Sequence, residues 1–202
     1  MFKKINLWLV IFFYFFSFHV LSIDNNSLVI DLYKNHKCIH GDFIQTTQYN
    51  DNSEFIQKGK FYIKRPNKIR LELFSGNDQI VVYDGECINQ YDISLNQLII
   101  KRIDGCYFSF IFLDHNLNKI LKVNKYEERD NCVLVSADFL NFDMGFREIN
   151  LVLLDTFIHR ISMVDVFDRV ISIDFLNVEF DGLLSDSFFE LILPDDVEII
   201  NM

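Results

Sequence analysis

The stretch GKFYIKRPNKIRLEL, residues 59–73, decides the fold of this chain. Side chains of a β-strand alternate between two faces, so Phe61, Ile63 and Arg65 share one face of its first half. Pro66 cannot donate an amide hydrogen bond to a neighbouring strand, so the first strand must stop there. The alternation then resumes, which predicts two strands joined by a short turn.

One face of this strand pair is apolar and carries a single charge. Its apolar residues are Phe61, Ile63, Ile69, Leu71 and Leu73, and the opposite face carries Lys60, Tyr62, Lys64, Lys68, Arg70 and Glu72. Arg65 falls on the apolar side at the end of its strand, where a buried guanidinium needs a partner. The alternative is an arginine that bends out into water, and the alternation leaves both open.

Residues 1–22 are predicted to be a secretory signal peptide that is cleaved near Ser22. Lys3 and Lys4 precede a nearly unbroken apolar run over residues 7–21, as in an exported precursor. The run is short for a bilayer span, which needs about 20 apolar residues, so an uncleaved anchor is the weaker alternative. No cysteine at the cleavage region offers a lipidation site, so we expect residues 23–202 to form one soluble domain.

Acidic residues outnumber basic ones. The chain has 29 Asp and Glu against 19 Lys and Arg, a formal net charge of −10, and loss of Lys3 and Lys4 makes it more negative. Such a surface repels the phosphates of nucleic acids, so we expect no nucleic-acid partner. The four cysteines are too widely spaced for a metal or redox motif, and both disulfides and free thiols stay open: Cys38, Cys87, Cys106 and Cys132.

Short alternating runs separated by turn residues predict about twelve strands. They cover residues 43–49, 55–65, 68–74, 79–83, 87–92, 97–103, 123–128, 132–137, 146–154, 157–165, 170–179 and 188–193. Strand mostly follows strand without a helix between, so neighbours are expected to pair antiparallel. A sheet of this length curls either into two packed sheets or into a barrel.

Two segments, residues 28–39 and 107–121, have apolar residues at helical spacing and are predicted to form two or three short helices. Their apolar positions include Leu28, Leu32 and Ile39 in the first segment and Phe110, Leu113 and Leu117 in the second. The beginning of the second segment, residues 107–112, is apolar nearly all round and is equally compatible with a buried strand.

The residue constellations of common enzyme classes are absent from the sequence. It has no nucleophile elbow, no zinc-protease histidine pair and no phosphate-binding glycine loop. His36, Cys38 and His40 look like a metal-ligand trio, but residues two apart on the expected helix point to different sides. We therefore expect no catalytic residues, no metal site and no cofactor.

Four segments in order resemble the LolA family of outer-membrane lipoprotein carriers. They are DFIQT at residues 42–46, GKFYIKRPNKIRLEL at 59–73, DQIVVYDGECINQYDISLNQ at 78–97 and FFELILPDDVEII at 188–200. The resemblance covers nearly all of residues 27–201. Its most specific part is the glycine and KRP of the second segment, followed by the DG turn of the third.

The resemblance implies a half-open antiparallel β-barrel of about 11–12 strands covered by about three short α-helices. It also implies a periplasmic, monomeric carrier of acylated lipoproteins, loaded by an inner-membrane Lol exporter and unloaded by a LolB-like outer-membrane acceptor. The family arginine of KRP, here Arg65, is implied to hold the helical lid against the barrel. Phe61, Ile63, Ile69, Leu71 and Leu73 would then line the acyl-binding cavity, and Leu28, Leu32, Ile39, Phe110, Leu113 and Leu117 would lie on the lid.

Two other classes compete with the carrier. A lipid- or lipoprotein-binding sensor of the same fold would share the apolar cavity but would not shuttle cargo. An outer-membrane barrel would need lipid-facing alternation throughout, whereas Lys60, Lys64 and Arg70 line an outer face here. The sequence therefore favours the carrier.

Overall fold

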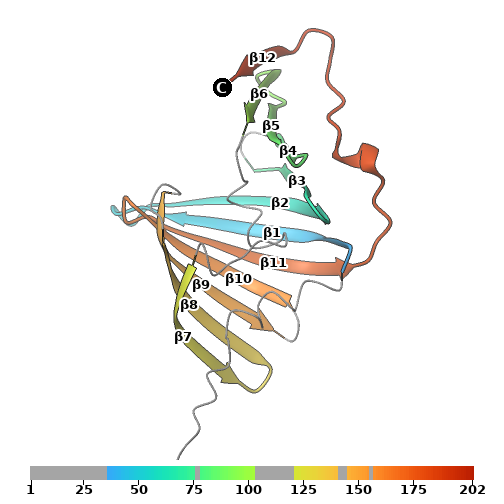
Figure 1. Cartoon of the computed structure of the whole chain (residues 1–202). Helices are drawn as coiled ribbons and strands as arrows, with labels where there is room; N and C mark the ends of the chain where they lie inside the picture. The colour runs from blue at the N-terminus through green and yellow to red at the C-terminus, as the bar shows by residue number, and fades with distance from the viewer. Residues whose placement is uncertain (1–35, 76–77, 103–120, 141–144, 155–156) are drawn as a thin grey trace, which may run out of the picture.

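The computed structural model describes residues 36–75, 78–102, 121–140, 145–154 and 157–202 (Figure 1). These residues form one sheet of twelve strands and one short 3-10 helix, η3 (Asp186–Phe189). The strands are β1 (Cys38–Gln48), β2 (Glu54–Lys64), β3 (Lys68–Leu73), β4 (Gln79–Tyr83), β5 (Cys87–Asp92), β6 (Gln97–Arg102), β7 (Leu121–Arg129), β8 (Cys132–Phe139), β9 (Phe146–Leu154), β10 (Phe157–Asp165), β11 (Val170–Phe180) and β12 (Glu198–Asn201).

The sheet is curved and unclosed. Its strand order is β12-β6-β5-β4-β3-β2-β1-β11-β10-β9-β8-β7, so β7 and β12 are its two edges. All neighbours pair antiparallel except β12, which pairs parallel to β6. β1 lies between β2 and β11 and joins two meanders, β2–β6 and β7–β11. The half-open antiparallel sheet that the family resemblance implies is therefore present.

The main core lies on one face of the sheet, which we call the inner face. Its buried residues come from β1–β4 and from β7–β11, and they pack into one cluster. Strands far apart in the sheet order can share a cluster only if the sheet curves around it. The buried cluster members are Ile39, Phe43, Phe61, Ile63, Ile69, Tyr83, Leu121, Val135, Ala137, Phe139, Ile149, Leu151, Leu153, Ile158, Ile161, Met163 and Phe175.

The prediction of a helical lid is wrong. The described residues contain no α-helix, and η3 is their only helical segment. Ile39, expected on the first lid helix, is a fully buried residue of β1, paired with Ile63 and with Phe180. Hydrogen bonding to strands on both sides overrides the helical spacing of its apolar neighbours. Five of the expected lid residues, Leu28, Leu32, Phe110, Leu113 and Leu117, lie outside the described residues.

The predicted strand over residues 188–193 is also wrong. η3 ends at Phe189, and the last strand, β12, begins only at Glu198. Phe188 and Phe189 are instead the last two residues of η3, and Phe189 is almost completely buried. Pro194 and the turn at residues 195–196 separate this segment from β12, because proline has no N–H to give a ladder.

Gly59 in β2 leaves room for the backbone of β3 and for an aromatic ring of β1. A Cβ atom at this position would lie 2.3 Å from the carbonyl oxygen of Glu72 and 2.7 Å from the ring of Phe43. The aromatic ring of Phe43 thus occupies the space that any other residue at position 59 would need. This explains physically why a glycine precedes the alternating segment.

We expect Gly59→Ala to destabilise the protein by about 1–3 kcal/mol, because backbone and a buried ring must both move. Urea unfolding followed by circular dichroism measures the change. Gly182→Ala is the matched control, since a Cβ there meets only the flexible side chain of His40. Equal unfolding free energies for the two variants would contradict this account of Gly59.

Candidate functional site

The inner face of β2 and β3 carries all five residues expected to form an apolar wall. Phe61 and Ile63 are 1% exposed, Ile69 is buried, and Leu71 and Leu73 are partly buried against the same cluster. The register pairs Phe61 with Leu71 and Ile63 with Ile69, so the two strands present their apolar residues side by side. Leu71 and Leu73 are the members of this set whose side chains are partly exposed.

The apolar wall extends onto strands that the sequence did not connect with it. Phe43 and Phe175 are directly paired across β1 and β11, and the ring of Phe61 meets that of Phe175 edge-on, with 5.1 Å between centroids. Phe157 continues the aromatic contacts toward Phe180. The alternation of residues 39–47 could have identified the β1 residues, but the pairing with β11 spans more than 120 residues of sequence.

Arg65 lies at the end of the apolar wall, directly after β2. Its backbone N–H donates to the carbonyl oxygen of Lys37 at 2.9 Å. The residue is partly buried, and its Nε atom is buried. The alternative in which the whole side chain extends into water therefore does not hold for Nε.

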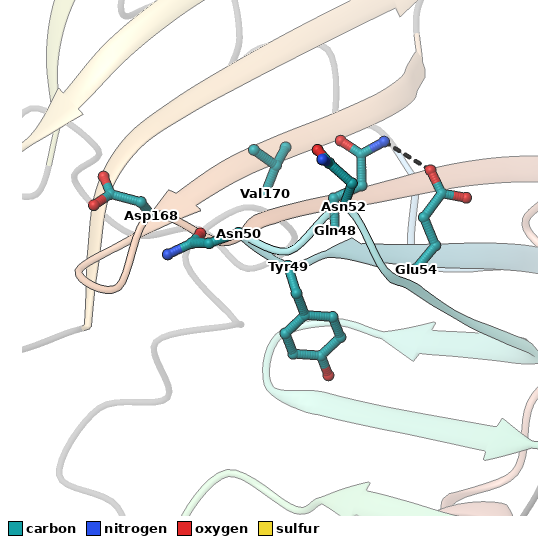
Figure 2. Close-up of a pocket in the computed structure, with 7 residues that line it drawn as sticks. All are labelled: Gln48, Tyr49, Asn50, Asn52, Glu54, Asp168 and Val170. Atoms are coloured by element: carbon teal, nitrogen blue, oxygen red, sulfur yellow. Dashed lines mark hydrogen bonds between the residues drawn. The ribbon is translucent and has the colours of Figure 1, made fainter.

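A pocket of about 300 Å³ lies at another part of the sheet, where the β1–β2 and β10–β11 hairpins turn (Figure 2). Its lining residues are Gln48, Tyr49, Asn50, Asn52, Glu54, Asp168 and Val170. Gln48 donates to Glu54 at 2.9 Å across the mouth of the hairpin. These polar groups suit water or a small polar molecule better than an apolar chain.

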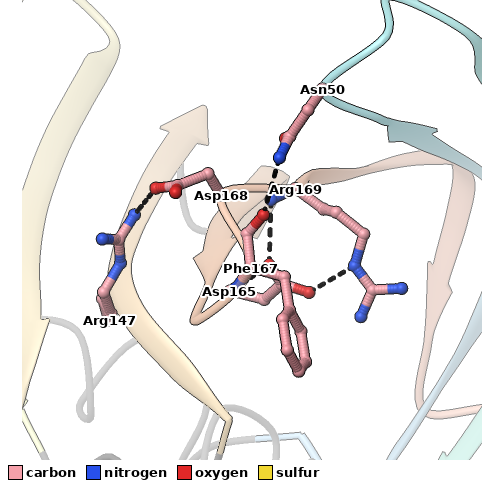
Figure 3. A network of polar contacts seen from close by, with 6 residues as sticks. All are labelled: Asn50, Arg147, Asp165, Phe167, Asp168 and Arg169. Atoms are coloured by element: carbon pink, nitrogen blue, oxygen red, sulfur yellow. Dashed lines mark hydrogen bonds and ion pairs between the residues drawn. The ribbon is translucent and has the colours of Figure 1, made fainter.

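Polar contacts hold the β10–β11 turn beside this pocket in place (Figure 3). The buried carboxylate of Asp165 accepts hydrogen bonds from the backbone N–H groups of Phe167 and Arg169, each at 2.9 Å, and from the Arg169 guanidinium at 2.5 Å. Asn50 donates to the carbonyl oxygen of Phe167, and Arg147 pairs with Asp168. The two adjacent hairpins are therefore cross-linked.

The electrostatics of Asp165 agree with a structural role. Burial alone raises the pKa of its carboxyl group, but the hydrogen bonds from Arg169 and Phe167 and the Arg169 charge outweigh burial and lower the pKa below its ordinary value. A carboxylate held ionised by its own turn is suited to fixing that turn rather than to proton transfer.

The described residues offer no site for metal chemistry. No group of three or more His, Cys, Asp or Glu side chains among them could hold a metal ion. Cys38, Cys87 and Cys132 are free thiols, while Cys106 lies outside the described residues. No helix in the described ranges is long and apolar enough to cross a bilayer.

Comparison with known proteins agrees with the architecture. The family model described as outer membrane lipoprotein carrier protein LolA matches residues 34–191. An outer-membrane lipoprotein carrier protein of Bordetella avium is 25% identical over 167 residues, covering 80% of each chain. That of Francisella tularensis subsp. novicida is 26% identical over 208 residues, covering 98% of this chain and 97% of the relative.

A solved structure supports the fold. The crystal structure of a LolA superfamily protein from Nitrosomonas europaea superposes with a TM-score of 0.52 at 11% identity, covering 82% of this chain and 96% of that one. The family match takes in the β2–β3 segment and most of the strands of the unclosed sheet. The chain therefore belongs to the LolA family of outer membrane lipoprotein carrier proteins.

Proposed function

We propose that this protein carries acylated lipoproteins through the periplasm, holding their acyl chains against the inner face of the sheet. The observation that supports the proposal most strongly is the combination of an unclosed sheet with one continuous apolar face. An open edge lets a chain enter from the side, and the apolar wall removes it from water. Leu71 and Leu73 would make the first contacts, with Phe61, Ile63 and Ile69 behind them.

The magnitudes are sufficient for a reversible carrier. Each buried methylene group contributes about 0.8 kcal/mol, so ten of them contribute about 8 kcal/mol before the cost of ordering the chain. A net free energy of about 8 kcal/mol corresponds to a dissociation constant of about 1 μM, so the buried chain must be longer than ten methylene groups to offset the ordering cost and reach that affinity. A carrier with this affinity keeps a lipoprotein soluble and still yields it to a stronger acceptor.

The family membership and the signal-peptide pattern suggest the compartment and the partners of the proposed carrier. An exported monomer without a lipidation cysteine at its new N-terminus would receive cargo from an inner-membrane Lol exporter. It would deliver that cargo to a LolB-like acceptor where one exists, or to the outer membrane itself. The relatives are named as outer-membrane lipoprotein carriers. No reaction is required for this cycle, so the protein acts as a binding protein and not as an enzyme.

Arg65 would limit how tightly the cargo is held. A cation that borders an apolar wall must lose part of its hydration when an acyl chain fills the space beside it, and that loss opposes binding. The arginine thus lowers the net affinity without reshaping the wall. This role requires only the position of Arg65 at the end of β2.

We expect Leu71→Gln to reduce the release of lipoproteins from spheroplasts about tenfold, because an apolar contact worth about 1.5 kcal/mol is lost. Release is measured as the fraction of an acylated lipoprotein that appears in the supernatant with the purified carrier. Leu95→Gln is the control, since Leu95 is 66% exposed in the β5–β6 turn. Mass spectrometry of the wild-type carrier purified from periplasm should detect bound acylated lipoprotein.

Two results would contradict the carrier. Equal release with Leu71→Gln and Leu95→Gln would separate cargo binding from the inner face. Bound lipid in the wild-type protein without any release from spheroplasts would favour a sensor of the same fold that recognises lipoproteins and does not transport them.

We expect Arg65→Leu to load normally and to pass its cargo to an acceptor or to outer-membrane vesicles at least tenfold more slowly, because the unfavourable dehydration of the cation is gone. Transfer is followed as loss of labelled lipoprotein from the carrier with time. The control is Arg102→Leu, a highly exposed arginine at the end of β6. A wild-type transfer rate for Arg65→Leu would exclude a role of this residue in release.

A further inference from the structure

The segment after β11 crosses the outer face of the sheet. We call residues 182–197 the strap. The strap leaves the end of β11, includes η3 and leads to the edge strand β12 (Figure 1). In sheet order, β11 and β12 are separated by β1 and the whole β2–β6 meander. The strap therefore links the centre of the sheet to its far edge.

Ion pairs fix the strap to the outer face of β2 and β3. The carboxylate of Asp186 lies 2.8 Å from Nζ of Lys64 and 3.2 Å from Nζ of Lys68. Lys64 also donates to the carbonyl oxygen of Leu184 at 2.7 Å. Lys64 and Lys68 are paired across the β2–β3 ladder, so one strap residue holds both strands.

An aromatic contact adds to this anchor. The ring of Phe188 packs edge-on against Tyr62, with 4.7 Å between centroids, and the Arg70 guanidinium lies 4.9 Å from its centre. Arg70 Nη1 also donates to the Phe188 carbonyl oxygen at 3.0 Å, and its Nε pairs with Glu72 at 2.8 Å. With 14% of its side chain exposed, Arg70 is a largely dehydrated contact.

The far end of the strap is fixed to β6. β12 extends the ladder of β6 in parallel, and the N–H of Glu198 donates to the carbonyl oxygen of Asn96 at 3.0 Å. The Asn96 side chain donates to the carbonyl oxygen of Asp196 at 3.2 Å. The strap is thus attached at β2–β3 and at β6, and it spans β4 and β5 between these points.

The strands between the two anchors have little packing on the inner face. Of all the residues in β4–β6, only Tyr83 belongs to the buried part of the main core cluster. Val82, Tyr91 and Leu98 are buried on the outer face instead, where the register places Val82 beside Arg70. The strap residue Phe189 is also buried outside the main core. The buried side chains of β4–β6 therefore lie mostly on the outer face, which is also the face that the strap contacts on β2 and β3.

We propose that the strap is a brace that sets how far β3–β6 spread from β2 and so determines the width of the apolar inner face. Asp186 and Phe188 are positioning residues in this proposal. They contact Lys64, Tyr62, Lys68 and Arg70, which alternate with Phe61, Ile63, Ile69 and Leu71 along the same two strands. The consequence for cargo rests on the function proposed above, whereas the consequence for the strands does not.

Hydrogen exchange measured by mass spectrometry tests the brace itself. In Phe188→Ala and in the milder Asp186→Asn, we expect amides of residues 68–102 to exchange at least tenfold faster, while residues 132–165 keep their wild-type rates. Arg160→Ala is the matched control, because it breaks an outer-face ion pair with Asp174 away from the strap. Phe188→Tyr retains the aromatic ring, so this variant should exchange at the wild-type rates.

Displacement of a dansylated fatty acid by palmitate measures the effect on the inner face. We expect both strap variants to bind palmitate at least fivefold more weakly than the wild type, since a wider face touches fewer methylene groups. Phe188→Tyr and Arg160→Ala should bind as the wild type does.

Two outcomes would overturn the brace. The first is faster exchange that is spread evenly over all strands, which would mean general destabilisation. The second is localised exchange with unchanged palmitate affinity, which would mean that the strap does not set the width of the face. If the wild-type protein binds no fatty acid, the proposed function fails. The exchange experiment still tests the strap in that case: faster exchange confined to residues 68–102 supports its hold on β3–β6, and uniformly faster exchange refutes it.

Discussion

The double pairing of β1 is the interaction on which the rest of the structure depends. β1 is hydrogen-bonded to β2 along one side and to β11 along the other, and it thereby joins two meanders that are separate in sequence. Ile39 and Phe43 lie at this junction and pack against residues from both halves. Without β1 the apolar residues of β2–β3 and of β8–β11 would not face the same space.

The two faces of the sheet then have different tasks. The inner face concentrates buried apolar side chains from nine strands, while the outer face of β2 and β3 carries the charged residues Lys64, Lys68 and Arg70. These charges are largely engaged by the strap. The alternation of one strand pair thus places the proposed cargo contacts and the attachment of the C-terminal segment on opposite faces of the same two strands.

Much of the strand pattern could be predicted from sequence because it is local. Alternation and turn residues located most strands to within a few residues, including the turn at Asp84-Gly85, where Gly85 adopts a positive φ of 109°. The predictions that failed depend on contacts between residues far apart in the sequence. The helical spacing of apolar residues before Gly41 wrongly predicted a helix at Ile39. The hydrogen bonds of β1 to β2 and β11 determine the backbone conformation there. Residues 188–193 were misread as a strand because the partners of Phe188, Tyr62 and Arg70, are more than 100 residues away in sequence.

In the candidate site, too, local patterns could be predicted from the sequence and contacts between distant segments could not. The common face of Phe61, Ile63, Ile69, Leu71 and Leu73 could be predicted because they belong to one strand pair, whereas the place of Phe43 and Phe175 depends on the β1–β11 register. The family match supports the assignment as a lipoprotein carrier, and the apolar inner face supplies a physical reason for it.

Photo-crosslinking with a palmitate analogue that carries a diazirine at the end of its chain tests the central claim most directly. Peptide mapping of the labelled wild-type protein should place the label on inner-face residues of β1–β3 and β11, such as Leu71, Leu73 and Ile173. Label confined to the outer face, or to the polar pocket at the hairpin turns, would contradict acyl binding on the inner face.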